Sequence, residues 1–190
     1  MAADRPLRAD AVRNRAKILA AAQAQITRHG PEVPMDAIAE AAGVAVGTLY
    51  RHYPDKTALV AAVLDEHMAE LARLTEEAGA RAEAGADAMT ELRALIVAVV
   101  DTAARDAAVK AAAQLFGASF AGQPGEKRAM LALRKLMDAA KAGGELHPDV
   151  TVEDFVMLLT TAPLDVPAEA RARWLALVLP GLTTVGRPIT

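Results

Sequence analysis

Apolar side chains return at three- and four-residue steps along most of this 190-residue chain. This spacing gathers them on one stripe of an α-helix, whereas a half-buried strand would alternate apolar and polar residues. The first such stripe consists of Val12, Ala16, Leu19, Ala22 and Ile26. Alanine, the strongest helix former, dominates a hydrophobic share of 53%. The sequence therefore predicts an all-α fold.

Glycine and proline residues interrupt these stripes and divide the chain into about nine predicted helices. Asp55 is a suitable N-cap for the fourth helix, and Thr151 with Asp154 forms a variant capping box before the eighth. The predicted ranges are about 11–29, 35–43, 46–52, 55–77, 88–105, 107–120, 125–142, 151–162 and 168–182.

Composition excludes several other classes of protein. The chain has no cysteine, so it has no disulfide framework, thiolate nucleophile or cysteine-based metal site. No apolar run approaches the ~18 residues that span a bilayer, and no apolar stretch follows the charges at the N-terminus. We therefore expect a soluble, cytoplasmic protein without a membrane segment or signal peptide.

The net charge is −3, but the charges are unevenly distributed. Residues 1–56 hold eight Lys or Arg and six Asp or Glu, whereas the remainder holds 13 and 18. Between residues 5 and 17, Asp10 is the one acid among five basic residues: Arg5, Arg8, Arg13, Arg15 and Lys17. Such a cluster suits a phosphate backbone, although a solvated basic segment explains these charges equally well.

The most informative segment is MDAIAEAAGVAVGTLYRHYPDK, residues 35–56. It reads as a short helix, a tight turn at Gly43 and a second short helix over 46–52. Small or apolar residues suit the contact between two such helices: Ile38, Ala39, Val44 and Leu49. This pattern is typical of a helix-turn-helix, whose second helix enters the major groove of DNA.

The second of these helices would turn outward the residues Val46, Gly47, Thr48, Tyr50, Arg51 and His52. Their side chains suit base edges and phosphates better than a protein core. Gly47 costs about 1 kcal/mol relative to alanine inside a helix, and close approach of the backbone to a phosphate would explain its presence. Lys56 opposes the dipole of the next helix, and a phosphate partner would explain that position. The alternative is a helical packing unit without a DNA role.

Residues 13–67 resemble the DNA-binding domain of the TetR family of bacterial repressors. The matching segments are RNRAKILAAAQAQITRHG, IAEAAGV and GTLYRHYPDKTALV, of which GTLYRHYPDK is the most specific. The resemblance implies a three-helix DNA-binding domain with a helix-turn-helix in residues 1–56. It also implies a helical bundle for ligand binding and dimerisation in residues 57–190. A phosphate contact is implied for Lys56 and a buried aromatic at Tyr53, with groove contacts from Thr48, Tyr50, Arg51 and His52.

Two positions depart from the family pattern. Ala45 stands where the family usually has Ser or Thr as the N-cap of the recognition helix, and Pro34-Met35 replaces a hydroxyl-bearing start of the second helix. Loss of such a cap typically costs ~1 kcal/mol. We therefore expect phosphate contacts from other basic residues of the domain: Arg13, Arg15 or Arg51.

The second domain has no recognisable catalytic set. Ser119, the one serine, lies in GASFA, which lacks the second glycine of a nucleophile elbow and follows a helix rather than a strand. Asp65, Glu66, His67 and Glu70 share a helix, but a metal would need ligands from other helices. We therefore predict no enzyme activity, catalytic residue, cofactor or metal, and regard a helical enzyme or carrier as the less favoured hypothesis.

Apolar residues of the middle helices could surround a ligand cavity. Methionine adapts to irregular apolar surfaces, and Arg134 among these residues is the candidate polar anchor. Core packing explains the same residues, so a DNA-binding protein of this fold without a small-molecule effector is the alternative. The candidate pocket residues are Met68, Leu92, Ile96, Leu115, Phe116, Phe120, Met130, Leu133, Arg134 and Met137.

The last two helices carry apolar residues on more than one face, which a monomer could not cover. The candidate dimer contacts are Phe155, Leu158, Leu159, Trp174, Leu177 and Val178. A two-fold dimer would place two recognition helices ~34–36 Å apart on a near-palindromic operator. The residues and the resemblance together predict a homodimeric transcription regulator, a repressor controlled by an apolar small molecule.

Overall fold

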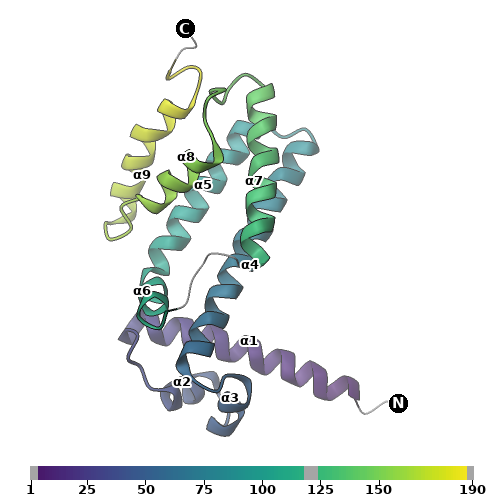
Figure 1. Ribbon diagram of the computed structural model, residues 1–190, viewed down its shortest axis with the longest axis vertical. Coiled ribbons are helices and arrows are strands. Elements are labelled where there is room, and N and C mark those ends of the chain that lie inside the picture. The colour runs from purple at the N-terminus through teal and green to yellow at the C-terminus, as the bar shows by residue number, and fades with distance from the viewer. Residues whose placement is uncertain (1–3, 118–123, 188–190) are drawn as a thin grey trace. The chain divides into compact units, whose positions relative to one another are not determined.

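The computed structural model describes residues 4–117 and 124–187, with side chains from Asp10 onward (Figure 1). Within these ranges the chain forms nine α-helices, one short 3-10 helix and no strand. The predicted all-α fold with about nine helices is therefore confirmed. None of the described helices is both long and apolar enough to cross a membrane. The helices are α1 (Asp4–His29), α2 (Met35–Ala42), α3 (Val46–His52), α4 (Lys56–Glu83), α5 (Ala88–Arg105), α6 (Ala107–Leu115), α7 (Pro124–Ala142), α8 (Val152–Thr160), α9 (Ala168–Val178) and η1 (Leu179–Leu182).

Most helices end near the glycine and proline residues that predicted their ends, and the exceptions have local causes. α1 begins earlier than predicted because Pro6 falls in its first turn, where proline is tolerated. α4 continues past Gly79 to Glu83, because an internal glycine costs a helix only about 1 kcal/mol. α6 ends before Gly117, whose φ of +69° lies in the left-handed region that favours glycine.

The chain divides into two compact units. The first comprises Met1–His67 and Arg105–Ala121, and the second comprises Met68–Ala104 and Gly122–Thr190. α4 therefore contributes its first part to one unit and its second part to the other. The division of function between residues 1–56 and 57–190 stays a prediction, because packing does not test which part binds DNA.

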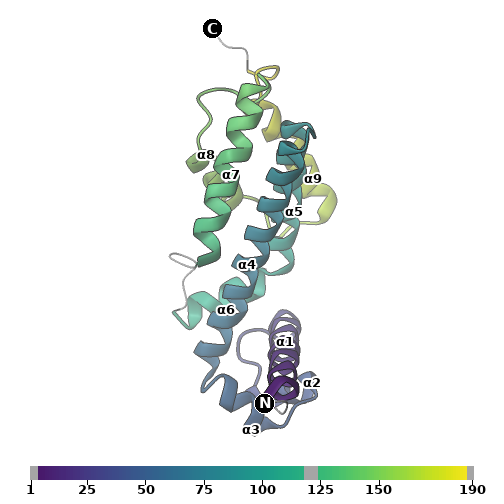
Figure 2. The ribbon, with the colours of Figure 1, turned by 90° about the vertical axis from the view of Figure 1, so that its right-hand side faces the viewer.

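The first unit is built on α1, which packs against α2 and α6 (Figure 2). Its core includes Ile18, Ile26, Leu59, Leu64 and Val109. Val12 is 69% exposed and Ala16 is also exposed, so the predicted apolar stripe is wrong at the start of α1. The helical spacing of apolar residues starts at Val12, but the residues of α1 that pack into the core start only at Ile18.

The second unit is a helical bundle of the second part of α4 with α5, α7, α8 and α9 (Figure 1). Its core includes Leu92, Ile96, Leu136, Leu146 and Phe155. The capping box predicted at the start of α8 is present. Thr151 Oγ1 accepts a hydrogen bond from the backbone N–H of Asp154, whose carboxylate accepts one from the backbone N–H of Thr151. These two bonds satisfy donors at the helix start that would otherwise have no partner.

Candidate DNA-binding surface

The turn between α2 and α3 depends on one glycine. Gly43 has a φ of +66°, a conformation that side chains disfavour, and its N–H donates to the Glu40 carbonyl over 3.0 Å. The next N–H, that of Val44, donates to the Ala39 carbonyl over 3.0 Å. These bonds end α2 and redirect the chain into α3. The two helices pack through fully buried side chains of Ile38, Ala39 and Leu49.

The end of α3 is fixed by Tyr53. Its backbone N–H donates to the Leu49 carbonyl over 2.8 Å, and its side chain is buried, as the resemblance implied. Burial raises the pKa of the Tyr53 hydroxyl, and the positive charge of Arg15 partly opposes this shift. Asp55 then caps α4, accepting a hydrogen bond from the backbone N–H of Ala58 over 2.8 Å. The orientation of α3 is thus set by the buried side chain of Leu49 within it and by buried Tyr53 at its end.

The outer face of α3 carries the side chains predicted to meet DNA. Tyr50 is 45% exposed, Val46 and Arg51 are also exposed, and Thr48 and His52 are half-buried. Arg51 Nε lies 3.3 Å from the Gly47 carbonyl oxygen, which keeps the guanidinium along the helix. This face therefore presents hydrogen-bonding groups and one aromatic ring to solvent, although Arg51 also bonds within α3 and the His52 ring lies 6.2 Å from that of Tyr53.

Gly47 lies on the same face of α3. A Cβ built there meets no atom within 4 Å, so packing within the chain does not require glycine. Its φ is not positive, so backbone conformation does not require glycine either. Neither packing among the described residues nor backbone conformation therefore accounts for glycine at this position, and its approach to a phosphate stays a prediction. The starts of α2 and α3 lack a side-chain cap at Pro34 and Ala45, as their sequence predicts.

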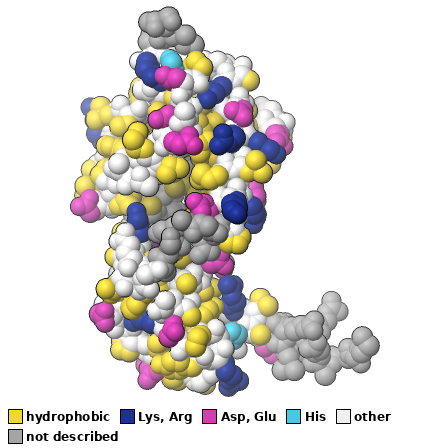
Figure 3. Space-filling model, in the orientation of Figure 1, with side chains coloured by type: hydrophobic (Ala, Val, Ile, Leu, Met, Phe, Trp, Pro, Cys, Tyr) yellow, Lys and Arg dark blue, Asp and Glu magenta, His cyan; other side chains and the backbone are white. Residues whose placement is uncertain are grey.

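The basic residues of the domain are only partly available to phosphate. Arg13 is exposed and pairs with Asp10, and Arg15 Nη1 lies 3.4 Å from a carboxylate oxygen of Glu66. Exposed salt bridges of this kind contribute only ~0–1 kcal/mol, so both arginines can exchange partners. On the face drawn in Figure 3, Lys and Arg side chains of the first unit are scattered and do not form a continuous patch.

Lys56 has internal partners that the sequence did not reveal. Its ammonium group donates to the Val33 carbonyl and lies 5.9 Å from the ring centroid of Phe116. Burial lowers the pKa of Lys56, and the negative charge of Glu32 partly opposes this shift. Lys56 therefore ties the start of α4 to the segment before α2 and to the residue that follows α6. A phosphate contact from Lys56 stays a prediction and would require it to leave the Val33 carbonyl.

The structure distributes the predicted pocket residues over both units. Leu115 is exposed and Phe116 half-buried in the first unit, whereas Met68 is half-buried in the second. Arg134 is exposed, and Phe120, like Ser119, lies outside the described residues. The others belong to the packed core of the second unit or lie against it: Leu92, Ile96, Met130, Leu133 and Met137.

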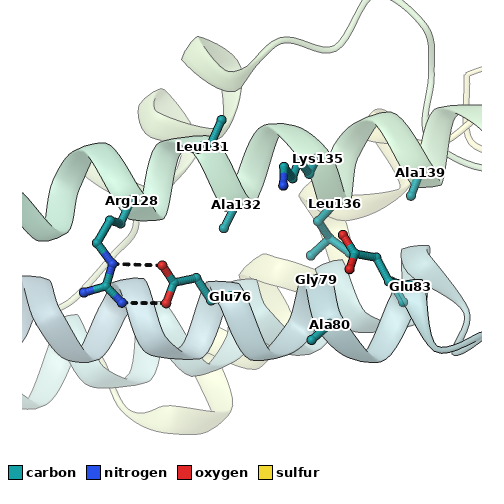
Figure 4. A pocket seen from close by; sticks show the side chains of 11 residues that line it. Glu76, Gly79, Ala80, Glu83, Arg128, Leu131, Ala132, Lys135, Leu136 and Ala139 are labelled. Atoms are coloured by element: carbon teal, nitrogen blue, oxygen red, sulfur yellow. Dashed lines mark hydrogen bonds and ion pairs between the residues drawn. The ribbon is translucent and has the colours of Figure 1, made fainter.

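The described residues of the second unit line at least two hollows, of which Figure 4 shows the larger. The smaller, of about 170 Å³, is lined by Arg134 and Met137 among others. The larger, of about 330 Å³, lies between α4 and α7, and none of the predicted pocket residues lines it. Sequence reasoning missed its lining because Gly79 and the small alanines form no stripe of large apolar residues.

The residues predicted to form the dimer interface differ in how exposed they are. Phe155 is 1% exposed and packs in the core of its own chain, so it has no surface left for a partner. Leu177 is 63% exposed, and exposed Val156 and Met157 on α8 add apolar surface that the prediction did not include. The remaining predicted contacts are half-buried: Leu158, Leu159 and Trp174, which pack against the core, and Val178.

A polar contact within the first unit also escaped the sequence reasoning. Asp106, at the N-cap of α6, accepts a hydrogen bond from Gln23 Nε2 of α1 over 2.7 Å. His67 Nε2 of α4 lies 3.6 Å from the other carboxylate oxygen of Asp106. Asp106 therefore joins α6 to α1 and α4. No local signal marks such a contact, because its members are far apart in the sequence.

Comparisons with known proteins relate the chain to one family of regulators. A family model described as bacterial regulatory proteins, tetR family, matches residues 18–63. A TetR transcription regulatory protein from Mycobacterium vanbaalenii is 32% identical, covers 94% of this chain and 99% of its own, and has a TM-score of 0.74. A TetR transcriptional regulator from Streptomyces coelicolor is also 32% identical, covers 89% of this chain and 98% of its own, and has a TM-score of 0.71.

A more distant structure, a gamma-butyrolactone receptor described as ArpA-like, shares the fold at 21% identity. It covers 92% of this chain and 89% of its own, with a TM-score of 0.63. No curated protein sequence matches the chain. The two regulators, in contrast, resemble it along almost its whole length, and the family model covers its helix-turn-helix. The chain therefore belongs to the TetR family of bacterial DNA-binding transcription regulators.

Proposed function

We propose that this regulator binds a near-palindromic operator as a homodimer and acts as a repressor that responds to a small molecule. The observation that carries the proposal is the outer face of α3, where Gly47 has open space above it and Tyr50 is exposed. Neither residue serves the packing of its own chain. A helix of this kind that is held in place by buried residues can enter a major groove ~12 Å wide.

In the proposed complex, base edges are read by Val46, Thr48, Tyr50 and His52. The guanidinium of Arg51 and the side chain of Arg13 contact phosphates, because both are exposed and neither is held by a buried partner. Arg15 and Lys56 join them after exchanging the partners described above. This assigns DNA binding to residues 1–56 and ligand binding and dimerisation to residues 57–190.

Apolar surface on α8 and α9 supports dimerisation. Leu177 and Met157 are exposed, and a partner subunit would remove these large apolar side chains from water. A two-fold axis through this surface would present two copies of α3 to one face of DNA. The hollow of about 330 Å³ favours a ligand-responsive regulator over one of the same fold without an effector, because small-molecule sites start at ~300 Å³.

The proposal is tested by two classes of substitution. Arg51→Ala should weaken binding to every duplex and reduce the slope of log affinity against log salt by about one. Tyr50→Ala should change which sequences are preferred, with each altered base pair costing ~1–3 kcal/mol. Arg93→Ala, an exposed arginine on α5, is the matched control for charge and should bind as the native protein does. Equal losses from Arg51→Ala and Arg93→Ala would contradict the assigned surface.

A further inference from the structure

The ammonium group of Lys56 already has two partners in the DNA-free chain. Lys56 is the first residue of α4, where the helix dipole disfavours a positive charge, and its side chain is half-buried. The ammonium group donates to the Val33 carbonyl and lies 5.9 Å from the centroid of the Phe116 ring. All three residues belong to the first unit. These contacts are therefore internal to the unit that carries the helix-turn-helix.

The Val33 carbonyl is a suitable acceptor because it lies outside the helices. Val33 is placed between the end of α1 at His29 and the start of α2 at Met35, and no backbone N–H of the described residues donates to its carbonyl oxygen. Its side chain is buried in the core of the first unit, which fixes the position of the carbonyl. A hydrogen bond from a charged donor is stronger than one between neutral groups. Lys56 therefore loses a favourable bond whenever it turns towards DNA.

The Phe116 ring is held in place independently of Lys56. Phe116 follows α6, and its backbone N–H donates to the Ala112 carbonyl over 3.0 Å. α6 is anchored in the core of the first unit by fully buried Val109, Ala112 and Ala113, and the Phe116 ring packs against that core. The ring therefore does not follow the ammonium group when Lys56 moves away.

The contact between the ring and the ammonium group is electrostatic. The face of an aromatic ring carries partial negative charge and attracts a cation within about 6 Å of its centroid, more strongly where water is excluded. Burial at this position lowers the pKa of Lys56, and the negative charge of Glu32 partly opposes this shift by favouring the ammonium form. The Phe116 ring and the Glu32 carboxylate thus both attract the ammonium group to its internal position.

We propose that Phe116 restrains DNA binding by holding Lys56 away from phosphate in the free protein. The proposal rests on the phosphate contact of Lys56 in the proposed function, and Phe116 is a positioning residue that acts through Lys56. Only molecules in which Lys56 has left Val33 and Phe116 can form that contact, so the apparent affinity falls in proportion to their fraction. Phosphate contacts carry no sequence information, so the ring lowers the affinity for every duplex alike.

Fluorescence anisotropy with a duplex selected from random DNA measures this restraint. Replacement of Phe116 by pentafluorophenylalanine nearly keeps the shape of the ring and reverses the polarity of its face. This protein should bind the duplex about two- to fivefold more tightly than the native protein, the factor that corresponds to one lost cation–π contact. Phe116→Leu, which removes the ring and keeps an apolar side chain, should have the same effect. Phe116→Tyr retains the ring and should bind as the native protein does.

A second background tests whether the effect depends on Lys56. Lys56→Met should weaken binding to every duplex and reduce the slope of log affinity against log salt by about one, and Lys127→Met, at an exposed position of α7, is its control. In the Lys56→Met background, the changes at Phe116 should no longer alter affinity. With Lys56 present they should keep the native salt slope, because they change the population of the free protein and not the number of phosphate contacts. Circular dichroism checks that each variant is folded.

NMR measures the position of Lys56 in the free protein without reference to DNA. The ε-methylene protons of Lys56 should be shifted upfield by the ring current of Phe116 in the native protein. This shift should be absent from Phe116→Leu and should disappear from the native protein when the duplex is added.

Two results would overturn the inference. One is equal or weaker binding of the duplex by the pentafluorophenylalanine protein, and weaker binding would show that the ring guides Lys56 towards phosphate. The other is an equal effect of Phe116→Leu in the native and Lys56→Met backgrounds, which would give Phe116 a purely structural role. Arg51→Ala separates this inference from the proposed function. If Arg51→Ala weakens binding and the changes at Phe116 do not alter it, the assigned DNA-binding surface stands and the restraint alone is wrong. A native protein that bound no duplex would contradict both.

Discussion

Replacing Gly47 by alanine should make the protein more stable and a weaker DNA binder. The added Cβ meets no atom within 4 Å, so the folded chain accommodates it without strain. Alanine is favoured over glycine inside a helix by about 0.5–1 kcal/mol, chiefly because glycine loses more backbone freedom on folding. The free energy of unfolding should rise by about this amount, and the melting temperature by roughly 1–4 °C.

DNA binding by the same variant should change in the opposite direction. If glycine is present so that a phosphate can approach the backbone of α3, a methyl group there separates the two by about the radius of a carbon atom. We expect a loss of at least about tenfold in operator affinity, which corresponds to ~1.4 kcal/mol. Urea denaturation and fluorescence anisotropy with a selected duplex measure the two quantities. A Gly47→Ala protein that is more stable and binds DNA as tightly as before would refute the reasoning.

Three further outcomes are expected. Gly125→Ala should lower the free energy of unfolding by about 1–3 kcal/mol because its Cβ meets the α4 backbone, whereas Gly79→Ala, with open space, should raise it by about 0.5–1 kcal/mol; equal effects in urea denaturation would be inconsistent with the close contact. Leu177→Glu should convert a dimer into a monomer in sedimentation analysis, and an unchanged mass would exclude this surface as the interface. The backbone N–H and hydroxyl of Thr151 lower the pKa of Asp154, so its contribution to stability is full above the ordinary pKa of Asp and disappears as pH falls through the lowered native value. Asp154→Asn should flatten the acid side of the stability curve, and a curve unchanged from the native one would show that this carboxylate contributes nothing.

Local rules predicted the helix-turn-helix well. The bounds of α3, the turn at Gly43 and the burial of Leu49 and Tyr53 all agree with the sequence. Each depends on residues within a few positions of one another, where helical periodicity and glycine conformation determine the structure. The capping box of α8 was predictable for the same reason.

Contacts between distant segments could not be predicted in this way. Lys56 looked available for phosphate because its sequence neighbours offer no partner, yet Val33 and Phe116 lie beside it in the fold. The pocket prediction followed apolar stripes, which show the face of a helix that is buried but not whether a neighbour fills the space against it. Leu92 and Ile96 are fully packed, whereas the larger hollow lies where Gly79 and alanines of α4 face alanines of α7.

The most direct test of the account is selection of duplexes from a random DNA pool, with the native chain and with a variant in which Val46, Thr48 and Tyr50 are alanine. The account predicts that the native protein enriches an inverted repeat and that the variant, although folded, loses this preference while keeping weak binding at low salt. Enrichment of the same repeat by both proteins, or of no sequence by the native one, would contradict the assignment of α3 as the reading helix.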